Sequence, residues 1–67
     1  MTVEVECETD GRWIAEVPEI PGALVYGETR DAAVAKVEAL VLRILADRLE
    51  NGEPAAEVEE VFTISAA

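Results

Sequence analysis

The segment "EVPEIPGAL", residues 16–24, decides how the chain folds, because it places two prolines and a glycine between two extended stretches. Pro18 has no N–H for a strand ladder, so the preceding strand must end there. Residues before a proline avoid helical geometry, and Gly22 permits the reversal that follows. We therefore predict a stiff connector between two neighbouring strands, with Glu19 and Ile20 exposed on it and able to contact a partner.

Two strands and a tight turn precede this connector. "TVEVECE", residues 2–8, alternates apolar and acidic side chains, which is typical of a strand with one buried face. The turn "TDG" places Gly11 where a three-residue hairpin loop needs a positive φ, and residues 12–17 form the returning strand. Pairing Glu8 with Arg12 then gives one apolar and one acidic face, as a sheet covered on a single side requires.

A long helix is predicted after a short third strand at residues 23–27. Thr29 is a suitable N-cap and Asn51-Gly52 is a C-cap signal, so the helix should occupy residues 30–50. Such a helix is about 32 Å long, whereas a six-residue strand spans only about 20 Å, so the helix overhangs the sheet. The apolar stripe expected to cover the sheet consists of Ala33, Val37, Leu40, Val41 and Ile44.

A second apolar stripe on this helix consists of Leu42, Leu45 and Leu49. On an overhanging helix it forms an exposed apolar patch, which favours self-association into a homo-oligomer. The alternative is that Leu45 wraps under the domain and Leu49 packs on the last loop.

The C-terminal stretch "EVFTIS", residues 60–65, is predicted to form a fourth strand with Phe62 and Ile64 facing inward. The element order is then β-β-β-α-β in a single domain over residues 1–67. The long crossover lets the helix pass over the sheet, so we expect an α+β fold arranged as a two-layer sandwich.

The composition excludes several functions. Fifteen acidic residues against five basic ones give a net charge of −10, without the basic cluster that nucleic-acid binding needs. The chain has no histidine, no nucleophile–base pair and no glycine-rich phosphate loop. The single cysteine, Cys7, fits a reducing compartment and falls on the apolar face, so we expect a buried, unreactive thiol. With no apolar run near ~20 residues and no signal-peptide start, we expect a cytoplasmic non-enzyme without cofactors.

The acidic face of the predicted hairpin is the best candidate for a contact surface. Alternate residues along a strand are about 6.7 Å apart, too far to share a Mg²⁺ ion with ligands at about 2.1 Å. Solvated carboxylates, or a surface that receives basic groups, therefore fit better than a metal site. The residues of this face are Glu4, Glu6, Glu8 and Glu16.

Residues 11–41, "GRWIAEVPEIPGALVYGETRDAAVAKVEALV", resemble the N-terminal domain of HicB-like antitoxins. The shared pattern is a glycine before an aromatic residue, an Ala-Glu-Val-Pro-x-x-Pro-Gly core, a strand ending in Gly-(Asp/Glu)-Thr, and a helix with alanine near its start. "GEP" at residues 52–54 also resembles the loop that follows the helix in that family. The matching residues are Gly11, Trp13, Ala15, Glu16, Val17, Pro18, Pro21, Gly22, Gly27, Glu28, Thr29 and Ala33.

The resemblance implies a degenerate ribonuclease-H-like fold with sheet order 3-2-1-4 and the fourth strand parallel to the first. It also implies a homo-oligomeric, non-enzymatic antitoxin of a type II toxin–antitoxin system, which neutralises a small basic RNA-cleaving toxin. The acidic face would then occupy the toxin's basic surface in place of RNA phosphates. The expected partner-binding residues are Glu4, Glu6, Glu16, Glu19 and Tyr26, whereas Trp13 belongs by its parity to the buried face.

Other readings of the sequence remain open. Family members usually continue into a DNA-binding helix-turn-helix or ribbon-helix-helix segment, whereas this sequence ends at Ala67, so we expect no direct DNA binding. One alternative is an orphan module of the same fold that self-associates through the second leucine stripe and has no toxin. Another is an enzyme of ribonuclease-H ancestry, which would need several converging carboxylates holding two metals; the sequence offers no such set.

Overall fold

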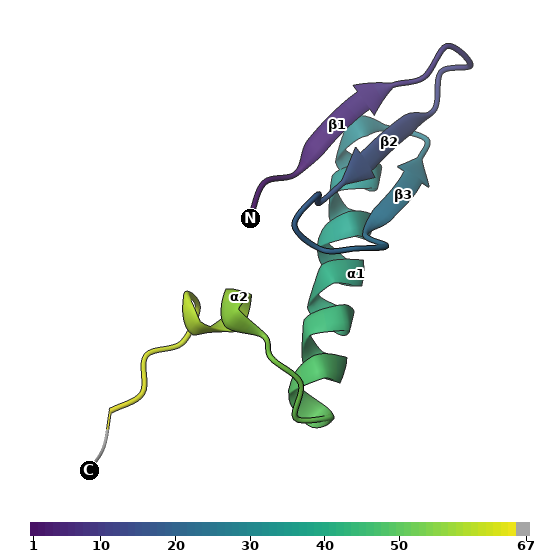
Figure 1. Cartoon of the computed structure of the whole chain (residues 1–67). Helices are drawn as coiled ribbons and strands as arrows, with labels where there is room; N and C mark the ends of the chain where they lie inside the picture. The colour runs from purple at the N-terminus through teal and green to yellow at the C-terminus, as the bar shows by residue number, and fades with distance from the viewer. Residues whose placement is uncertain (66–67) are drawn as a thin grey trace.

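A computed structural model describes residues 1–65 of the chain. The fold is α+β, with a three-stranded antiparallel sheet in the order β1-β2-β3 and one long helix, α1, against one face of it (Figure 1). The elements are β1 (Glu4–Cys7), β2 (Trp13–Glu16), β3 (Leu24–Gly27), α1 (Arg30–Glu50) and α2 (Ala56–Glu59).

The first hairpin has the predicted register. Val5 pairs with Ala15, and the N–H of Glu8 donates to the carbonyl oxygen of Arg12 at 2.7 Å. Gly11 closes the loop with a φ of 90°, which glycine adopts without steric cost. Because side chains alternate along each strand, the glutamates of β1 fall on one face and Val5 and Ala15 on the face toward α1.

The connector between β2 and β3 contributes the side chain of Ile20 to the core. Its backbone forms two successive turns, in which the N–H of Ile20 donates to the oxygen of Val17 and the N–H of Ala23 donates to the oxygen of Ile20. These turns fold the connector back and direct the Ile20 side chain inward, where only 1% of its surface is exposed. The prediction that Ile20 lies on the surface is therefore wrong.

Helix α1 occupies the predicted range, because both of its ends are capped as the sequence indicates. At the start, the Thr29 hydroxyl accepts a hydrogen bond from the N–H of Ala32 at 3.0 Å. At the end, Gly52 has a φ of 70° and the N–H of Glu53 donates to the oxygen of Arg48 at 2.8 Å. The final turns of the helix extend beyond the sheet, as the expected lengths require (Figure 1).

The core lies between α1 and the middle of the sheet. The helix packs mainly against β2 and β3, so Val5 of β1, which faces it, is only half-buried. Gly27 permits the closest approach, since a Cβ atom there would lie 2.6 Å from the backbone nitrogen of Ala33. The buried residues are Ala15, Val17, Ile20, Ala23, Ala33, Val37, Val41 and Leu45.

Two further positions differ from their predicted exposure. Leu45 belongs to the core, which agrees with the alternative prediction for this residue, because α2 folds back beside α1 and Val58 packs against the buried cluster that includes Leu45 (Figure 1). Cys7, predicted to be buried, is exposed because it ends an edge strand that α1 hardly covers.

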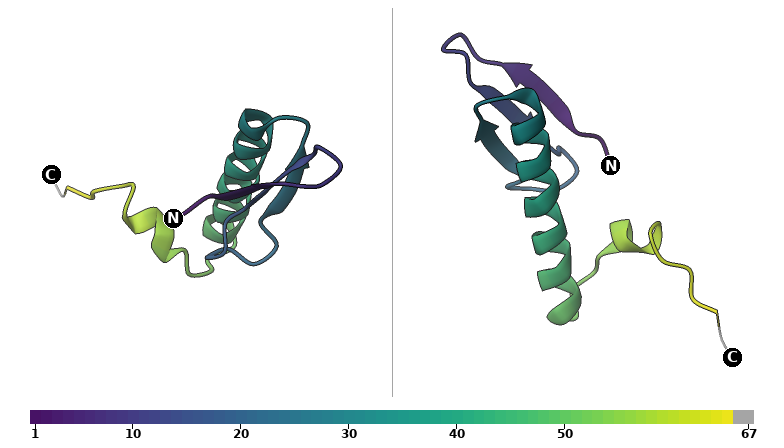
Figure 2. Two further views of the ribbon diagram at one scale, coloured as in Figure 1. Left: turned by 90° about the horizontal axis from the view of Figure 1, so that it is seen from above. Right: turned by 180° about the vertical axis from the view of Figure 1, so that it is seen from behind.

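The predicted fourth strand at residues 60–65 is not formed. After α2 the chain turns, with the N–H groups of Val61 and Phe62 both donating to the oxygen of Val58 at 2.9 and 3.2 Å. Beyond this turn the chain runs away from the sheet (Figure 1 and Figure 2), which leaves Phe62 67% and Ile64 94% exposed. Within residues 1–65 the sheet therefore has three strands, and the predicted inward packing of Phe62 and Ile64 is wrong.

Candidate functional site

The face of the sheet opposite α1, here called the outer face, brings together most of the predicted partner-binding residues. The strand registers place its side chains in two rows that run across the three strands. One row consists of Glu4, Glu16 and Leu24, and the other of Glu6, Ile14 and Tyr26.

The β1 side of the outer face is acidic. Glu4, Glu6 and Glu16 are exposed and, with Ile14, line a shallow depression of about 210 Å³. Glu4 lies directly opposite Glu16, and like charges at such a cross-strand position repel each other. A basic group placed between them would relieve this repulsion, so the depression suits a lysine or arginine side chain of a partner.

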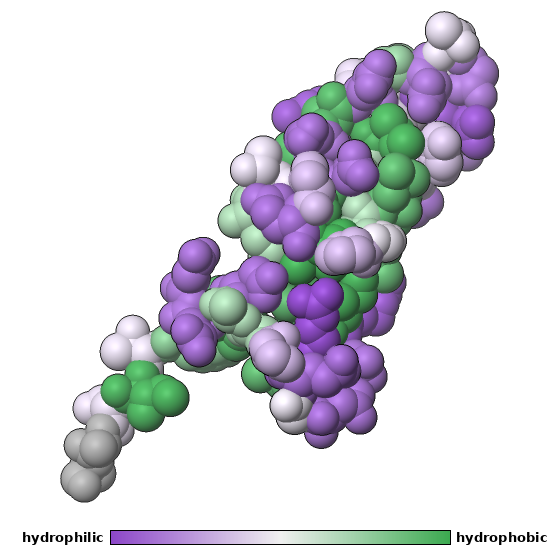
Figure 3. Space-filling model, viewed as in Figure 1, coloured by the Kyte–Doolittle hydropathy of each residue, from purple (hydrophilic) through white to green (hydrophobic). Residues whose placement is uncertain are grey.

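The β3 side of the outer face is apolar. Leu24 and Tyr26 are each 44% exposed, and the half-buried Ile14 lies between Tyr26 and the acidic β1 side. Figure 3 shows hydrophobic residues next to hydrophilic ones over the sheet end of the molecule. Exposed aromatic and aliphatic side chains bordered by charges are typical of the centre and rim of a protein–protein interface.

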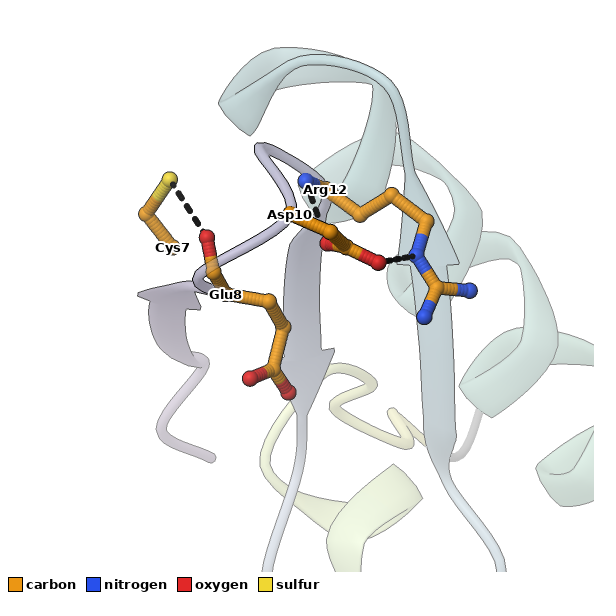
Figure 4. Close-up of polar contacts among 4 residues, drawn as sticks. All are labelled: Cys7, Glu8, Asp10 and Arg12. Atoms are coloured by element: carbon orange, nitrogen blue, oxygen red, sulfur yellow. Dashed lines mark hydrogen bonds and ion pairs between the residues drawn. The ribbon is translucent and has the colours of Figure 1, made fainter.

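An ion pair in the hairpin loop positions a cation over the aromatic residue of this face. The Asp10 carboxylate accepts hydrogen bonds from the backbone N–H of Arg12 at 3.1 Å and from its Nε–H at 2.8 Å (Figure 4). Both bonds, the backbone one first, hold the pKa of Asp10 below its ordinary value. The guanidinium of Arg12 lies 4.6 Å from the centre of the Tyr26 ring, so Tyr26 is held in place by a cation–π contact.

Glu19 lies apart from the two rows of the outer face. It belongs to the connector, and its carboxylate accepts a hydrogen bond from the backbone N–H of Thr2 at 3.0 Å. Its own backbone N–H and then that of Thr2 lower the pKa of Glu19. This glutamate therefore ties the start of β1 to the connector, whereas the other four predicted residues share one face.

The relationship of the chain to known proteins extends over almost its whole length. It is 37% identical over 67 residues to "UPF0150 protein ssl0738" of Synechocystis sp. (strain ATCC 27184 / PCC 6803 / Kazusa). The aligned region covers 96% of this chain and 93% of the relative. The chain belongs to the UPF0150 family. The relative's name specifies neither an activity nor a partner. No protein-family model matches the sequence, and no solved structure matches it.

The sequence already places Arg12 and Ile14 on the same face as the glutamates, but it does not include Arg12, Ile14 or Leu24 among the expected partner-binding residues of this UPF0150 protein. The period of two along β3 contained the signal for Leu24, because Ala23 and Val25 face the helix and the residue between them must face outward. The contact of Arg12 with Tyr26 depends on the order of the strands, so it required the structure.

Among residues 1–65 no group of three or more cysteine, aspartate or glutamate side chains is placed to hold a metal ion. The Cys7 thiol lies 3.6 Å from the oxygen of Glu8 at the end of β1 (Figure 4). In the same part of the chain, no helix is both long and apolar enough to cross a membrane.

Proposed function

We propose that this UPF0150 protein is a non-enzymatic antitoxin-like module whose outer face binds and neutralises a small basic RNA-cleaving toxin. The observation that carries the proposal is the outer face itself. Three carboxylates and an anchored aromatic residue share an exposed sheet surface. The resemblance of residues 11–41 to HicB-like antitoxins supports the same function.

The proposed mechanism is electrostatic replacement of the RNA. A toxin that cleaves RNA must expose a basic surface toward the phosphates, and the glutamates of β1 and β2 would pair with those basic groups. Leu24 and Tyr26 would supply the apolar contact area beside the ion pairs. The net charge of −10 would also accelerate association with a basic protein at low salt.

The proposal also covers the compartment, the cofactors and the complete fold of the protein. An antitoxin of this kind would act in the cytoplasm, where its toxin cleaves RNA, and would need no cofactor. The resemblance also supports a ribonuclease-H-like sheet of order 3-2-1-4, with a fourth strand parallel to β1.

The test is capture of partners from host lysate with the tagged protein at low and high salt, followed by affinity measurement with the purified partner. We expect a small basic protein whose RNA cleavage is inhibited by this chain and whose binding weakens as salt increases. The double variant Glu6→Lys/Glu16→Lys should weaken binding at least tenfold.

The matched control is Glu50→Lys/Glu53→Lys, which changes the net charge equally at the far end of α1. This control should retain most of the affinity. If both double variants weaken binding equally, net charge and not the outer face determines the interaction. A captured basic protein whose RNA cleavage continues in the complex would contradict the antitoxin function.

A second candidate function is an orphan module that acts by self-association and has no toxin. The observation in its favour is that Leu42 and Leu49 are 66% and 52% exposed on α1, although Leu45 between them is buried. The double variant Leu42→Glu/Leu49→Glu should then be monomeric by light scattering. If this variant retains an oligomeric mass, these two leucines do not form the interface.

A further inference from the structure

The two edges of the sheet are unequal in their backbone hydrogen bonding. On β3, the register directs the backbone groups of Leu24 and Tyr26 away from β2. Both residues have local partners, because the N–H of Leu24 donates to the oxygen of Gly22 at 3.0 Å and Lys36 Nζ donates to the oxygen of Tyr26 at 3.4 Å. A lysine placed in this way protects an edge strand from pairing with another chain.

The edge at β1 has no such protection. The bond from the N–H of Glu8 to Arg12 shows that the even-numbered residues of β1 bond to β2, so Val5 and Cys7 direct their backbone groups outward. Within the described chain, β1 pairs only with β2. The outward N–H and C=O groups of β1 therefore form a template for one more strand.

An apolar groove of about 250 Å³ lies beside this edge, between the start of β1 and the middle of α1. It is open because α1 packs mainly against β2 and β3, which leaves the helix side of β1 half covered. A strand added to β1 would place alternate side chains over this groove. The lining residues are Met1, Val3, Val17, Glu38, Val41 and Leu42.

The C-terminal segment, residues 61–65, has the features of such a strand. Phe62 and Ile64 are two positions apart and exposed, while Thr63 between them is polar. The segment has five residues, and β1 has four. When the backbone of this segment pairs with β1, Phe62 and Ile64 can both face the groove while Thr63 faces outward.

The single chain is elongated, which favours association with a partner. The radius of gyration is 14.3 Å and the molecule measures 53 × 21 × 15 Å, whereas a compact chain of this length has a radius of gyration of about 11 Å. Figure 3 shows a hydrophobic residue standing out from the body on the C-terminal segment. The turn at Val58, which packs against the core, directs this segment away from its own β1.

We propose that two copies of this chain exchange their C-terminal segments, each segment pairing with β1 of the other copy as a fourth strand. Phe62 and Ile64 of one copy would fill the groove of the other copy beside Val3 and Val41. The exchange is reciprocal, so it forms a closed dimer and covers both exposed edges and both segments. This dimer is independent of toxin binding, because the outer face of each sheet remains exposed.

The first test measures the mass of the purified full-length protein by light scattering over a range of concentrations. We expect a dimer. The double variant Phe62→Glu/Ile64→Glu should raise the dimer dissociation constant at least tenfold without changing the circular dichroism of α1. The control Thr63→Glu adds one such charge on the outward side of the same segment, so it should remain dimeric. A monomeric wild type, or equal effects of Thr63→Glu and the double variant, would overturn the proposal.

The second test identifies which copy supplies the strand. Two differently isotope-labelled samples of the protein are mixed, and nuclear Overhauser effects that arise only between copies are recorded. We expect such effects between Ile64 of one copy and Val3 or Val5 of the other. Contacts between these residues only within one copy would show that each chain supplies its own fourth strand. Dimers without these contacts would place the interface elsewhere. Neither measurement requires a toxin, so their failure is distinct from a failure of the proposed function.

Discussion

The sheet end of the molecule and its C-terminal end differ in how much of their apolar surface they bury. From Ala15 to Leu45, eight apolar side chains form the buried core, and each of them is at most 5% exposed. Beyond Leu45, the large apolar residues are mostly on the surface, as Leu49, Phe62 and Ile64 show. Burying such a side chain contributes about 1.5–3 kcal/mol, so the C-terminal end lacks most of the stabilisation that the sheet end has.

The two ends also differ in the number of hydrogen bonds that they form between residues near each other in sequence. The hairpin, the connector and the start of α1 are each closed by hydrogen bonds between residues near each other in sequence. The C-terminal segment has one such turn, at Val58, and beyond it the residues up to 65 pair with no strand. The sheet end therefore closes within one chain, whereas the large apolar residues of the C-terminal end stay exposed in it.

The largest expected effect is a difference in stability between one substitution at the sheet end and one at the C-terminal end. Ile20→Ala removes a fully buried side chain and should reduce the free energy of unfolding by about 3 kcal/mol. Ile64→Ala removes an exposed side chain and should change the free energy of unfolding by less than about 0.5 kcal/mol in dilute protein. Urea denaturation measures both values. Equal losses for the two variants would contradict the contrast between the ends.

Measuring stability at several protein concentrations tests the contrast between the two ends further. If copies exchange their C-terminal segments, the stability of the wild type increases with concentration, since association stabilises the folded state by mass action. Ile64→Ala should then become destabilising at high concentration, while the loss from Ile20→Ala remains. A wild type whose denaturation midpoint is independent of concentration would contradict this expectation.

A smaller effect is expected from the glycines at the sheet end. Gly27→Ala places a Cβ atom 2.6 Å from the nitrogen and 2.9 Å from the Cα of Ala33, so β3 and α1 must separate. We expect a loss of about 2–3 kcal/mol, as for other overpacked sites. Gly11→Ala is the matched control, because a Cβ there meets no atom within 4 Å and the only cost is the positive φ. This control should lose about 1 kcal/mol, and a larger loss for it than for Gly27→Ala would contradict the close packing of β3 on α1.

The features that the sequence predicted correctly are local ones. The register of the hairpin, the Thr29 cap and the range of α1 depend on residues within a few positions of each other, where propensity and periodicity act directly. The acidic side of the outer face followed from the same periodicity, because Glu4, Glu6 and Glu16 alternate with core residues.

The features that the sequence did not predict depend on distant contacts. Ile20 is buried because two turns fold the connector inward, and Leu45 is buried where α2 returns beside α1. The apolar side of the outer face needed the pairing of β2 with β3, which brings Tyr26 beside Ile14. The predicted fourth strand had the right alternation, but a strand also needs an edge to pair with, and periodicity does not specify that edge.

The smallest expected effect concerns pH and the hairpin loop at the sheet end. The pKa of Asp10 is lowered in the folded protein, first by the backbone N–H of Arg12 and then by its side chain. A lowered folded-state pKa means that the ionised carboxylate stabilises the fold above the ordinary pKa of 3.8, and that this contribution is lost as the pH falls through the folded value. The Asp10 side chain is 53% exposed, so the change should be small and screened by salt.

Two variants separate the causes of this shift. Asp10→Asn can still accept the backbone hydrogen bond but carries no charge, so its difference in urea midpoint from the wild type should decrease as the pH falls from 7 to 3. Arg12→Ala removes the guanidinium and keeps the backbone N–H, which is the larger cause of the shift. The pKa of its Asp10 carboxyl, followed by NMR titration, should therefore stay below the ordinary value. A return to the ordinary pKa in Arg12→Ala would show that the ion pair, and not the loop backbone, stabilises the carboxylate.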